Sequence, residues 1–302
     1  MSFPDYLTRI PNVVDLSQPN TLQIVPKVQV NDQGVHVTIP RSTKQPAVFL
    51  WNQKISQLTL HVSEGVAAEV ILLRVLSGNA KQSFQIQLDS DASLSLHEAE
   101  WNLRASKTSI QRRLTLQKSA RLEHQLLSSL EGTSESDFFL DLQGARAEYA
   151  GETFLVASGE SKAFAHQRLE HHAKSSVSNI QNILVASEAS DLDYSVNGFI
   201  EKGMAGSICR QQNRGVILSP KGSVRVDPKL YIDEYDVEAG HGAAIGQIDE
   251  EQLFYLLSRG LTEDEAKRLI LSGYTEQFLA PYEALEIRSR LEQRIANRLK
   301  GA

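Results

Sequence analysis

Short segments in which apolar and polar residues alternate follow one another from about residue 28 to about residue 232. Alternation with a period of two is typical of β-strands that bury one face. Clear examples are VHVTI at 35–39, LTLHV at 58–62 and FQIQL at 84–88. Parallel strands in a wound sheet need helical crossovers of about a dozen residues, and the segments leave no room for them. The run therefore predicts a mainly β body.

Three all-β architectures fit a run of this length: a sandwich, a barrel and a solenoid. The spacing between the expected strands is loosely regular, and charged residues are scattered along the whole run. A solenoid, in which each coil stacks on the preceding one, fits this uniformity best. We therefore expect a parallel β-helix and keep a sandwich as the alternative.

The two ends of the chain differ from this body. Prolines recur through the first thirty residues and break any long helix, which predicts an irregular arm. After Gly246 the pattern becomes helical, and the spacings of Asp249 to Gln252 and of Thr262 to Glu265 are those of capping boxes. We expect a helix at 250–258, ended by Gly260, and a second at 264–272, ended by Gly273. A third is expected at 282–300. Its apolar stripe consists of Ala284, Ile287, Leu291, Ile295 and Leu299. The expected parts are an arm at 1–30, a β-helix core at 31–246 and a helical subdomain at 247–302.

Composition excludes several classes of function. A formal net charge of −6 argues against broad binding to nucleic acid, which needs clustered basic residues. One cysteine, Cys209, forms no internal disulfide and provides too few thiolates for a self-contained zinc or iron–sulfur site. No signal-peptide pattern opens the sequence and no run approaches 20 apolar residues. We therefore expect a cytoplasmic protein that does not span a membrane.

The junction of the body and the helical end carries a series of motifs in order. These are Gln212-Asn213-Arg214, Pro228-Lys229-Leu230, Asp236-Val237, Gly240-His241-Gly242-Ala243, Gly246, Leu253-Phe254-Tyr255-Leu256, Ser258-Arg259-Gly260 and Glu265-Ala266. Over about sixty residues they resemble the closing segment of the SufB/SufD family of iron–sulfur cluster assembly proteins. Upstream the resemblance is weaker, and we expect the helical region with which family members usually begin to be largely absent here.

The resemblance implies a fold and a set of partners. Members of this family have a right-handed parallel β-helix with helical ends. SufB and SufD pair through their β-helices, and each carries the ABC ATPase SufC on its C-terminal helices. ATP hydrolysis in SufC then reshapes the pair so that a cluster forms at the interface. This chain has no GxxxxGK[ST] phosphate loop, which agrees with a subunit that does not itself bind ATP by that route.

One position favours the SufD branch. Ala239 matches a position where SufB carries a cysteine that holds the nascent cluster, and alanine offers no thiolate. His241 matches a histidine that in SufD is a candidate ligand facing that cysteine, and neutral imidazole is a competent iron ligand. We expect no tightly bound cofactor in the isolated chain, and a transient iron–sulfur cluster shared with SufB at His241. The alternative role for His241 is structural, in a tight turn between two glycines.

Other residues have a structural and a functional interpretation. His166, His171 and His172 are a loose group from which a metal site is conceivable, although they also fit an exposed strand edge. Cys209 is interpreted as a buried small residue in preference to a sulfur carrier. The segment Leu253-Phe254-Tyr255-Leu256-Leu257 is apolar all round, so it is either a core helix or a docking helix. We favour docking to SufC, through Phe254, Tyr255 and Arg259.

The sequence thus predicts a non-catalytic SufD-like subunit that pairs with a SufB-like chain and a SufC-like ATPase. A homodimer in isolation is left open. The first rival is a carbohydrate-active β-helix enzyme, which needs paired carboxylates; Asp141, Glu152, Asp191 and Asp193 form no obvious pair. The second rival is a metal-dependent enzyme built on the three histidines named above.

Overall fold

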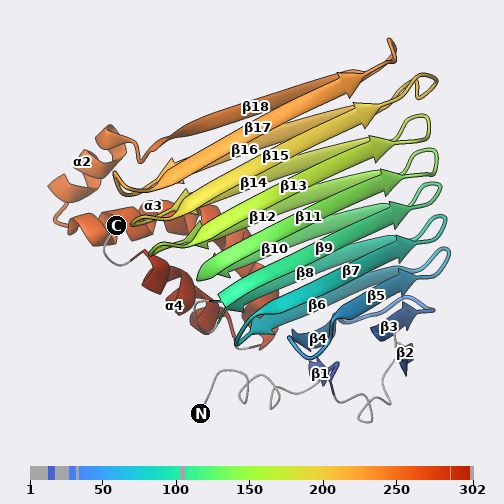
Figure 1. The fold of residues 1–302 in the computed structure, drawn as a ribbon, viewed down its shortest axis with the longest axis horizontal. Helices are drawn as coiled ribbons and strands as arrows, with labels where there is room; N and C mark the ends of the chain where they lie inside the picture. Colours follow the sequence, from blue (N-terminus) through green and yellow to red (C-terminus); the bar gives the residue numbers. More distant parts are fainter. Residues whose placement is uncertain (1–12, 18–26, 32–33, 103–105, 286, 300–302) are drawn as a thin grey trace.

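The computed structural model describes residues 13–17, 27–31, 34–102, 106–285 and 287–299. Within them the chain is a parallel β-solenoid followed by a helical subdomain (Figure 1), as the sequence predicts. Its strands form two nine-stranded sheets that face each other. Sheet A contains, in spatial order, β1 (Val13–Asp15), β4 (Ala47–Asn52), β6 (Ala67–Leu76), β8 (Ser93–Asn102), β10 (Arg121–Leu130), β12 (Glu148–Ala157), β14 (Val177–Ala186), β16 (Ile208–Ile217) and β18 (Glu238–Gln247). Sheet B contains β2 (Lys27–Asn31), β3 (Gly34–Ile39), β5 (Gln57–Val62), β7 (Ala80–Leu88), β9 (Ser106–Leu116), β11 (Gly132–Leu142), β13 (Lys162–His171), β15 (Asp191–Ile200) and β17 (Ser223–Ile232).

Each coil gives one strand to each sheet, and every coil lies directly on the one before. In sheet A, Ala67 pairs with Ser93, Ser93 with Arg121, and Arg121 with Glu148. The pairing is parallel throughout the described strands, except that β2 and β3 form an antiparallel hairpin. β1 and β2 lie in the segment for which we expected an irregular arm, and the rest of that arm is outside the described residues.

Turns with a left-handed residue fix the register from coil to coil. Asp91, Ser119, Arg146 and Ser175 have φ near +57°, +55°, +59° and +56°. Each of their N–H groups donates to a carbonyl of the following coil, as Asp91 does to Lys118 (2.8 Å) and Ser119 to Ala145 (2.9 Å). A left-handed residue costs conformational energy when it is not glycine, and these repeated hydrogen bonds offset that cost.

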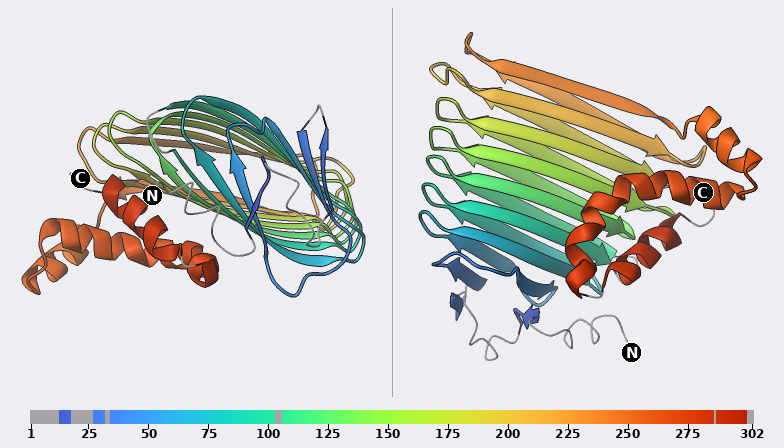
Figure 2. Two further views of the ribbon diagram at one scale, coloured as in Figure 1. Left: turned by 90° about the horizontal axis from the view of Figure 1, so that it is seen from below. Right: turned by 180° about the vertical axis from the view of Figure 1, so that it is seen from behind.

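Within the described residues, the helices that follow the solenoid cover one of its two sheets. α3 (Glu263–Leu279), the 3-10 helix η2 (Ala280–Leu285) and α4 (Arg288–Arg298) pack on the outer face of sheet A (Figure 2). Phe154 of β12 lies against Phe278 of α3, with ring centroids 5.9 Å apart. Four members of the predicted apolar stripe are buried: Ile287, Leu291, Ile295 and Leu299. The side chain of Ala284 is outside the described part. The helical subdomain is therefore anchored to the solenoid by a second apolar core.

Several predicted boundaries differ from the structure. α2 (Glu250–Ser258) has the predicted limits, and Thr262 and Glu265 form the predicted capping box at the start of α3. Gly273 does not end that helix, because the turns beyond it bury Thr275, Phe278 and Leu279. Pro228, which belongs to one of the junction motifs, lies inside β17. The glycine-rich segment around His241, for which a tight turn was the alternative, is the full strand β18.

Candidate functional site

The solenoid ends without a cap at β17 and β18. All ten residues of β18 are exposed, whereas the inward-facing residues of β16, the strand before it in sheet A, are buried. Apolar side chains are left uncovered at this end, with Ile245 43% and Ile232 37% exposed. Repeat proteins need a polar cap at each end to remain soluble alone. The end of this solenoid is therefore a surface that another chain can cover.

The backbone of β18 is available for pairing on its outer edge. The N–H of Glu238 donates to the carbonyl of Ser207, toward β16. Backbone groups point alternately to the two sides of a strand, so Ala239, His241, Ala243 and Ile245 direct theirs to the free edge. Unpaired edges of this kind are templates for a further strand.

His241 stands at the centre of this free edge. It pairs in register with Gln211, and Ala239 pairs with Cys209 of the coil below. Gly240 and Gly242 flank it, and a Cβ atom added at either glycine would meet nothing within 4 Å. The open space at these two glycines lies on the opposite face of the strand, and His241 is itself exposed.

Cys209 lies one coil behind this edge, in the interior. It is fully buried, and burial raises the pKa of its thiol. Gly198 on the opposite sheet leaves the necessary room, since a Cβ there would lie 2.6 Å from the Cys209 Sγ atom. A buried, protonated thiol is a poor nucleophile or ligand, so the geometry agrees with the structural interpretation.

The three histidines of the metal hypothesis do not come together. His171 is inside the solenoid, where Nδ1 and Nε2 each lie 2.8 Å from a serine hydroxyl, of Ser176 and Ser178. His166 and His172 are on the outside of sheet B, and His172 Nδ1 is 2.8 Å from Asp141. The described residues contain no group of three or more histidine, cysteine or acidic side chains placed to hold a metal ion.

The carboxylates of the glycosidase hypothesis are also dispersed. Asp141 contacts His172 on the outer face of sheet B, and Asp193 is in an ion pair with Arg225 on the same face. Glu152 belongs to sheet A and accepts a hydrogen bond of 2.9 Å from Gln125. No two of these three carboxylates therefore form a facing pair.

A buried ionic network occupies the interior, which sequence reasoning missed. Arg112 of β9 bonds to Glu98 (2.6 Å) and Glu100 (2.9 Å) of β8 across the two sheets, and Arg74 of β6 bonds to Glu100 (2.6 Å). Burial alone would raise the pKa of Glu98, but the Arg112 guanidinium and His124 hold it well below the usual range. The network joins the two sheets and leaves the interior with balanced charge.

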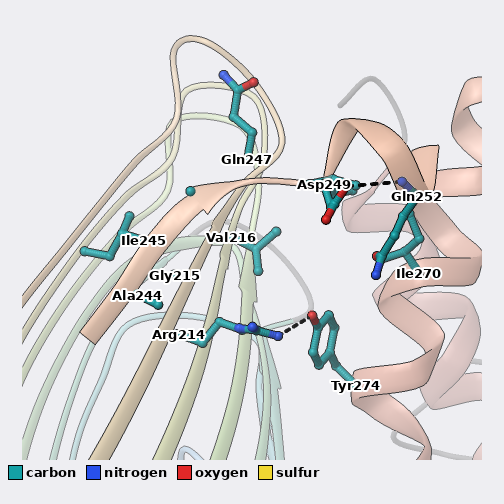
Figure 3. A pocket seen from close by; sticks show the side chains of 12 residues that line it. Arg214, Gly215, Val216, Ala244, Ile245, Gln247, Asp249, Gln252, Ile270 and Tyr274 are labelled. Atoms are coloured by element: carbon teal, nitrogen blue, oxygen red, sulfur yellow. Dashed lines mark hydrogen bonds between the residues drawn. The ribbon is translucent and has the colours of Figure 1, made fainter. Parts of the chain in front are cut away.

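The motif Gln212-Asn213-Arg214 is divided between the two faces of β16. Asn213 points inward and bonds to Asn182 (2.8 Å) and to the carbonyl of Gly242 (3.2 Å). Arg214 points outward and donates to the Tyr274 hydroxyl (2.6 Å) across a cavity of about 300 Å³ (Figure 3). This cavity separates β18 from α3, next to the open edge.

α2 projects from the molecule without burying a side chain. Phe254 is 73%, Tyr255 56% and Leu257 39% exposed. The Arg259 guanidinium lies over the Tyr255 ring, 5.1 Å from its centroid. An aromatic surface on a short helix is what an anchored protein contact requires, and a core role for this helix is excluded.

These features define an open-ended parallel β-solenoid with a helical subdomain packed on one sheet. The SufBD core domain of the SUF iron–sulfur cluster assembly system matches residues 51–274. The chain belongs to the SufB/SufD family. No helix in the described part is long and apolar enough to cross a membrane.

Individual relatives match over shorter stretches. The iron–sulfur cluster assembly protein SufD of Bacillus subtilis is 34% identical over 151 residues, which are 50% of this chain and 34% of that protein. A SufBD family protein of Synechocystis is 23% identical over 76% of this chain and 48% of its own length. One of Mycobacterium tuberculosis is 32% identical over 50% of this chain and 18% of its own. The chain thus matches less than half the length of each of these relatives.

Proposed function

We propose that this chain is a SufD-type, non-catalytic subunit that pairs with a SufB-type chain and takes part in iron–sulfur cluster assembly in the cytoplasm. The observation that carries the proposal is the exposure of all ten residues of β18 at the uncapped end. A strand from the SufB-type chain adds to this edge and covers Ile245 and its neighbours. The burial of apolar surface and the new backbone hydrogen bonds both stabilise the pair.

The cluster is the cargo of this interface. The exposed imidazole of His241 provides one ligand, and Ala239 provides none. The thiolates that an iron–sulfur cluster needs therefore come from the SufB-type chain. A site divided in this way exists only in the complex, so the isolated chain retains a cluster poorly.

The ATPase binds at α2, next to this interface. α2 directly follows β18 and presents Phe254, Tyr255 and Arg259 to solvent. A SufC-type ATPase that grips this helix acts close to the free edge. Nucleotide-driven motion then reaches the paired strands through the short connection at Ile248 and Asp249.

The experiment is to mix the purified chain with the SufB-type and SufC-type chains of the same organism and to size the products by chromatography with light scattering. We expect a complex that contains all three. In a cluster reconstitution with this complex, His241→Ala lowers the cluster yield at least about tenfold, as expected for loss of a ligand. His166→Ala, an exposed histidine on sheet B, leaves the yield unchanged.

Two results would contradict the proposal. One is elution of the chain alone, or only as a homodimer, when both other chains are present. The other is an unchanged cluster yield with His241→Ala, which would remove His241 from the site.

A further inference from the structure

The outer face of sheet B carries a row of stacked cationic and aromatic side chains. The Arg113 guanidinium lies over the Phe139 ring, 4.4 Å from its centroid. Phe139 pairs in register with Arg168 on the next strand, and the Arg168 guanidinium lies 3.9 Å from the Phe199 centroid. Phe199 in turn stacks on Tyr231, with centroids 4.6 Å apart and an interplanar angle of 6°. We call these five residues the outer stack.

The outer stack ends on an unfilled position. Tyr231 belongs to β17, the edge strand of sheet B, and remains 50% exposed. Phe199 stacks on one face of the Tyr231 ring. On the side of the opposite face, sheet B has no further described strand. The row therefore stops where the solenoid stops, with a π-face directed at whatever covers the open end.

The free edge of β17 offers one backbone donor fewer than that of β18. The N–H groups of Ser223 and Asp233 donate to Ser190 and Ile200, toward β15. By alternation, the even-numbered residues of β17 direct their backbone groups to the free edge, and Pro228 is one of them. Proline has no N–H to donate and is a recognised protection for edge strands. Strand addition at β17 is therefore interrupted at its centre, where side-chain contacts must replace the missing hydrogen bond.

The charge around Tyr231 indicates which kind of partner side chain would bind to its ring. Asp233, Glu234 and Asp236 follow Tyr231 closely in the sequence, and Lys229, two residues before it, is already paired with Asp227 (2.6 Å). Asp233 and Asp236 are exposed, and backbone N–H groups of Gly203 and Tyr235 hold the pKa of Glu234 below its usual value. A negative surface beside a free aromatic ring fits a planar cation, and arginine combines stacking with ion pairing.

We propose that Tyr231 receives an arginine of the SufB-type chain, which continues the outer stack across the interface. This inference rests on the proposed function. In the complex the guanidinium stacks on the free face of Tyr231 while Asp233 and Asp236 neutralise its charge. Strand addition at β18 supplies affinity, and the arginine at Tyr231 fixes the orientation of the second chain.

The test measures the dissociation constant of the pair with full-length variants. Tyr231→Leu keeps an apolar side chain but removes the ring, and it weakens binding about tenfold, as expected for loss of a desolvated cation–π contact. Tyr231→Phe retains near-wild-type affinity. The double substitution Asp233→Asn/Asp236→Asn weakens binding at low salt and reduces its salt dependence. Phe164→Leu, a 43% exposed ring on the same face but on the inner strand β13, is the matched control and has no effect.

The outcomes separate this inference from the proposed function. If the wild type binds the SufB-type chain tightly and Tyr231→Leu binds it equally well, the arginine contact is overturned, while the proposed pairing of the two chains stands. If Tyr231→Leu weakens binding but the aspartate substitutions have no effect, the group that contacts Tyr231 is aromatic or apolar, and the arginine contact is again overturned. Absence of wild-type binding contradicts the pairing itself.

Discussion

A row of amide side chains inside the solenoid is linked by hydrogen bonds. Asn182 donates to Gln167 (3.0 Å) and to Asn213 (2.8 Å), and Asn213 continues the chain of hydrogen bonds to the Gly242 carbonyl of the last coil. Buried polar groups are costly when unpaired and specify a unique register when paired. These amides therefore tie the terminal strand β18 to the interior, although its own side chains are exposed.

His171 makes the stability of the fold sensitive to acid. Burial lowers the pKa of its imidazole from 6.5 to about 4. The unfolded chain therefore takes up a proton as the pH falls below about 6.5, while the folded chain does so only near 4. The stabilisation associated with neutral His171 is present above pH 6.5 and is lost on acidification. From pH 7 to 4.5 we expect a loss of about 2.5 kcal/mol in the free energy of unfolding from this group.

Denaturant unfolding at the two pH values measures this effect. In His171→Gln, acidification from pH 7 to 4.5 lowers the free energy of unfolding by about 2.5 kcal/mol less than it does in the wild type. His172→Gln is the control of opposite sign. The hydrogen bond that His172 donates to Asp141 raises the pKa of His172, so the stabilisation from His172 is present at acid pH and is lost as the pH rises. An identical pH dependence in wild type and His171→Gln would contradict the buried, neutral imidazole.

At the scale of elements, α2 is the clearest case of a helix that the monomer does not need. Its aromatic residues are exposed, so replacing them removes no core contact. We expect Phe254→Ala/Tyr255→Ala to change the free energy of unfolding by no more than about 0.5 kcal/mol. Binding of the SufC-type ATPase, measured by calorimetry, falls at least about tenfold.

Phe164→Ala is the matched control for this element, because Phe164 is an exposed aromatic on the sheet that carries no helices. It leaves ATPase binding unchanged. If the double variant bound the ATPase as tightly as the wild type, α2 would not be the docking helix.

The strands of the middle coils could be predicted from the sequence, and β18 could not. In β15, alternation places Leu192, Tyr194 and Val196 inward, which the pattern shows directly. β18 reads EAGHGAAIGQ, which shows no alternation and has one strand-forming residue, Ile245. It is a strand because the ladder of β16 pairs with it at every position. Local propensity therefore failed at the one strand that carries the candidate site.

Tertiary packing also decided the positions of the charges. Alternation predicts that Glu98 and Arg112 lie on one face or the other, but only the juxtaposition of β8 and β9 shows that they meet inside. The same holds for the outer stack, whose members are about thirty residues apart in the sequence and adjacent in space. His241 was found from a motif, while its exposure at an open edge follows only from the structure.

At the scale of the whole molecule, the two edge strands of the last coil, β17 and β18, differ. The edge of sheet A is free of proline and rich in glycine and alanine, and the edge of sheet B is interrupted by Pro228. We therefore expect strand addition at β18 and side-chain contacts around Pro228 in β17. In the proposed complex this asymmetry gives the second chain one orientation, with α2 and the cavity at Arg214 close to the paired strands.

Amide hydrogen exchange of β18, with and without the SufB-type chain, tests strand addition most directly. We expect the edge-facing amides of Ala239, His241, Ala243 and Ile245 to exchange rapidly in the free chain and at least about tenfold more slowly in the complex. Ala243→Pro, which removes one edge-facing N–H, weakens the complex, and Ala243→Ser, which retains it, does not. Unchanged exchange of these amides in a stable complex, or full binding by Ala243→Pro, would show that the second chain joins elsewhere.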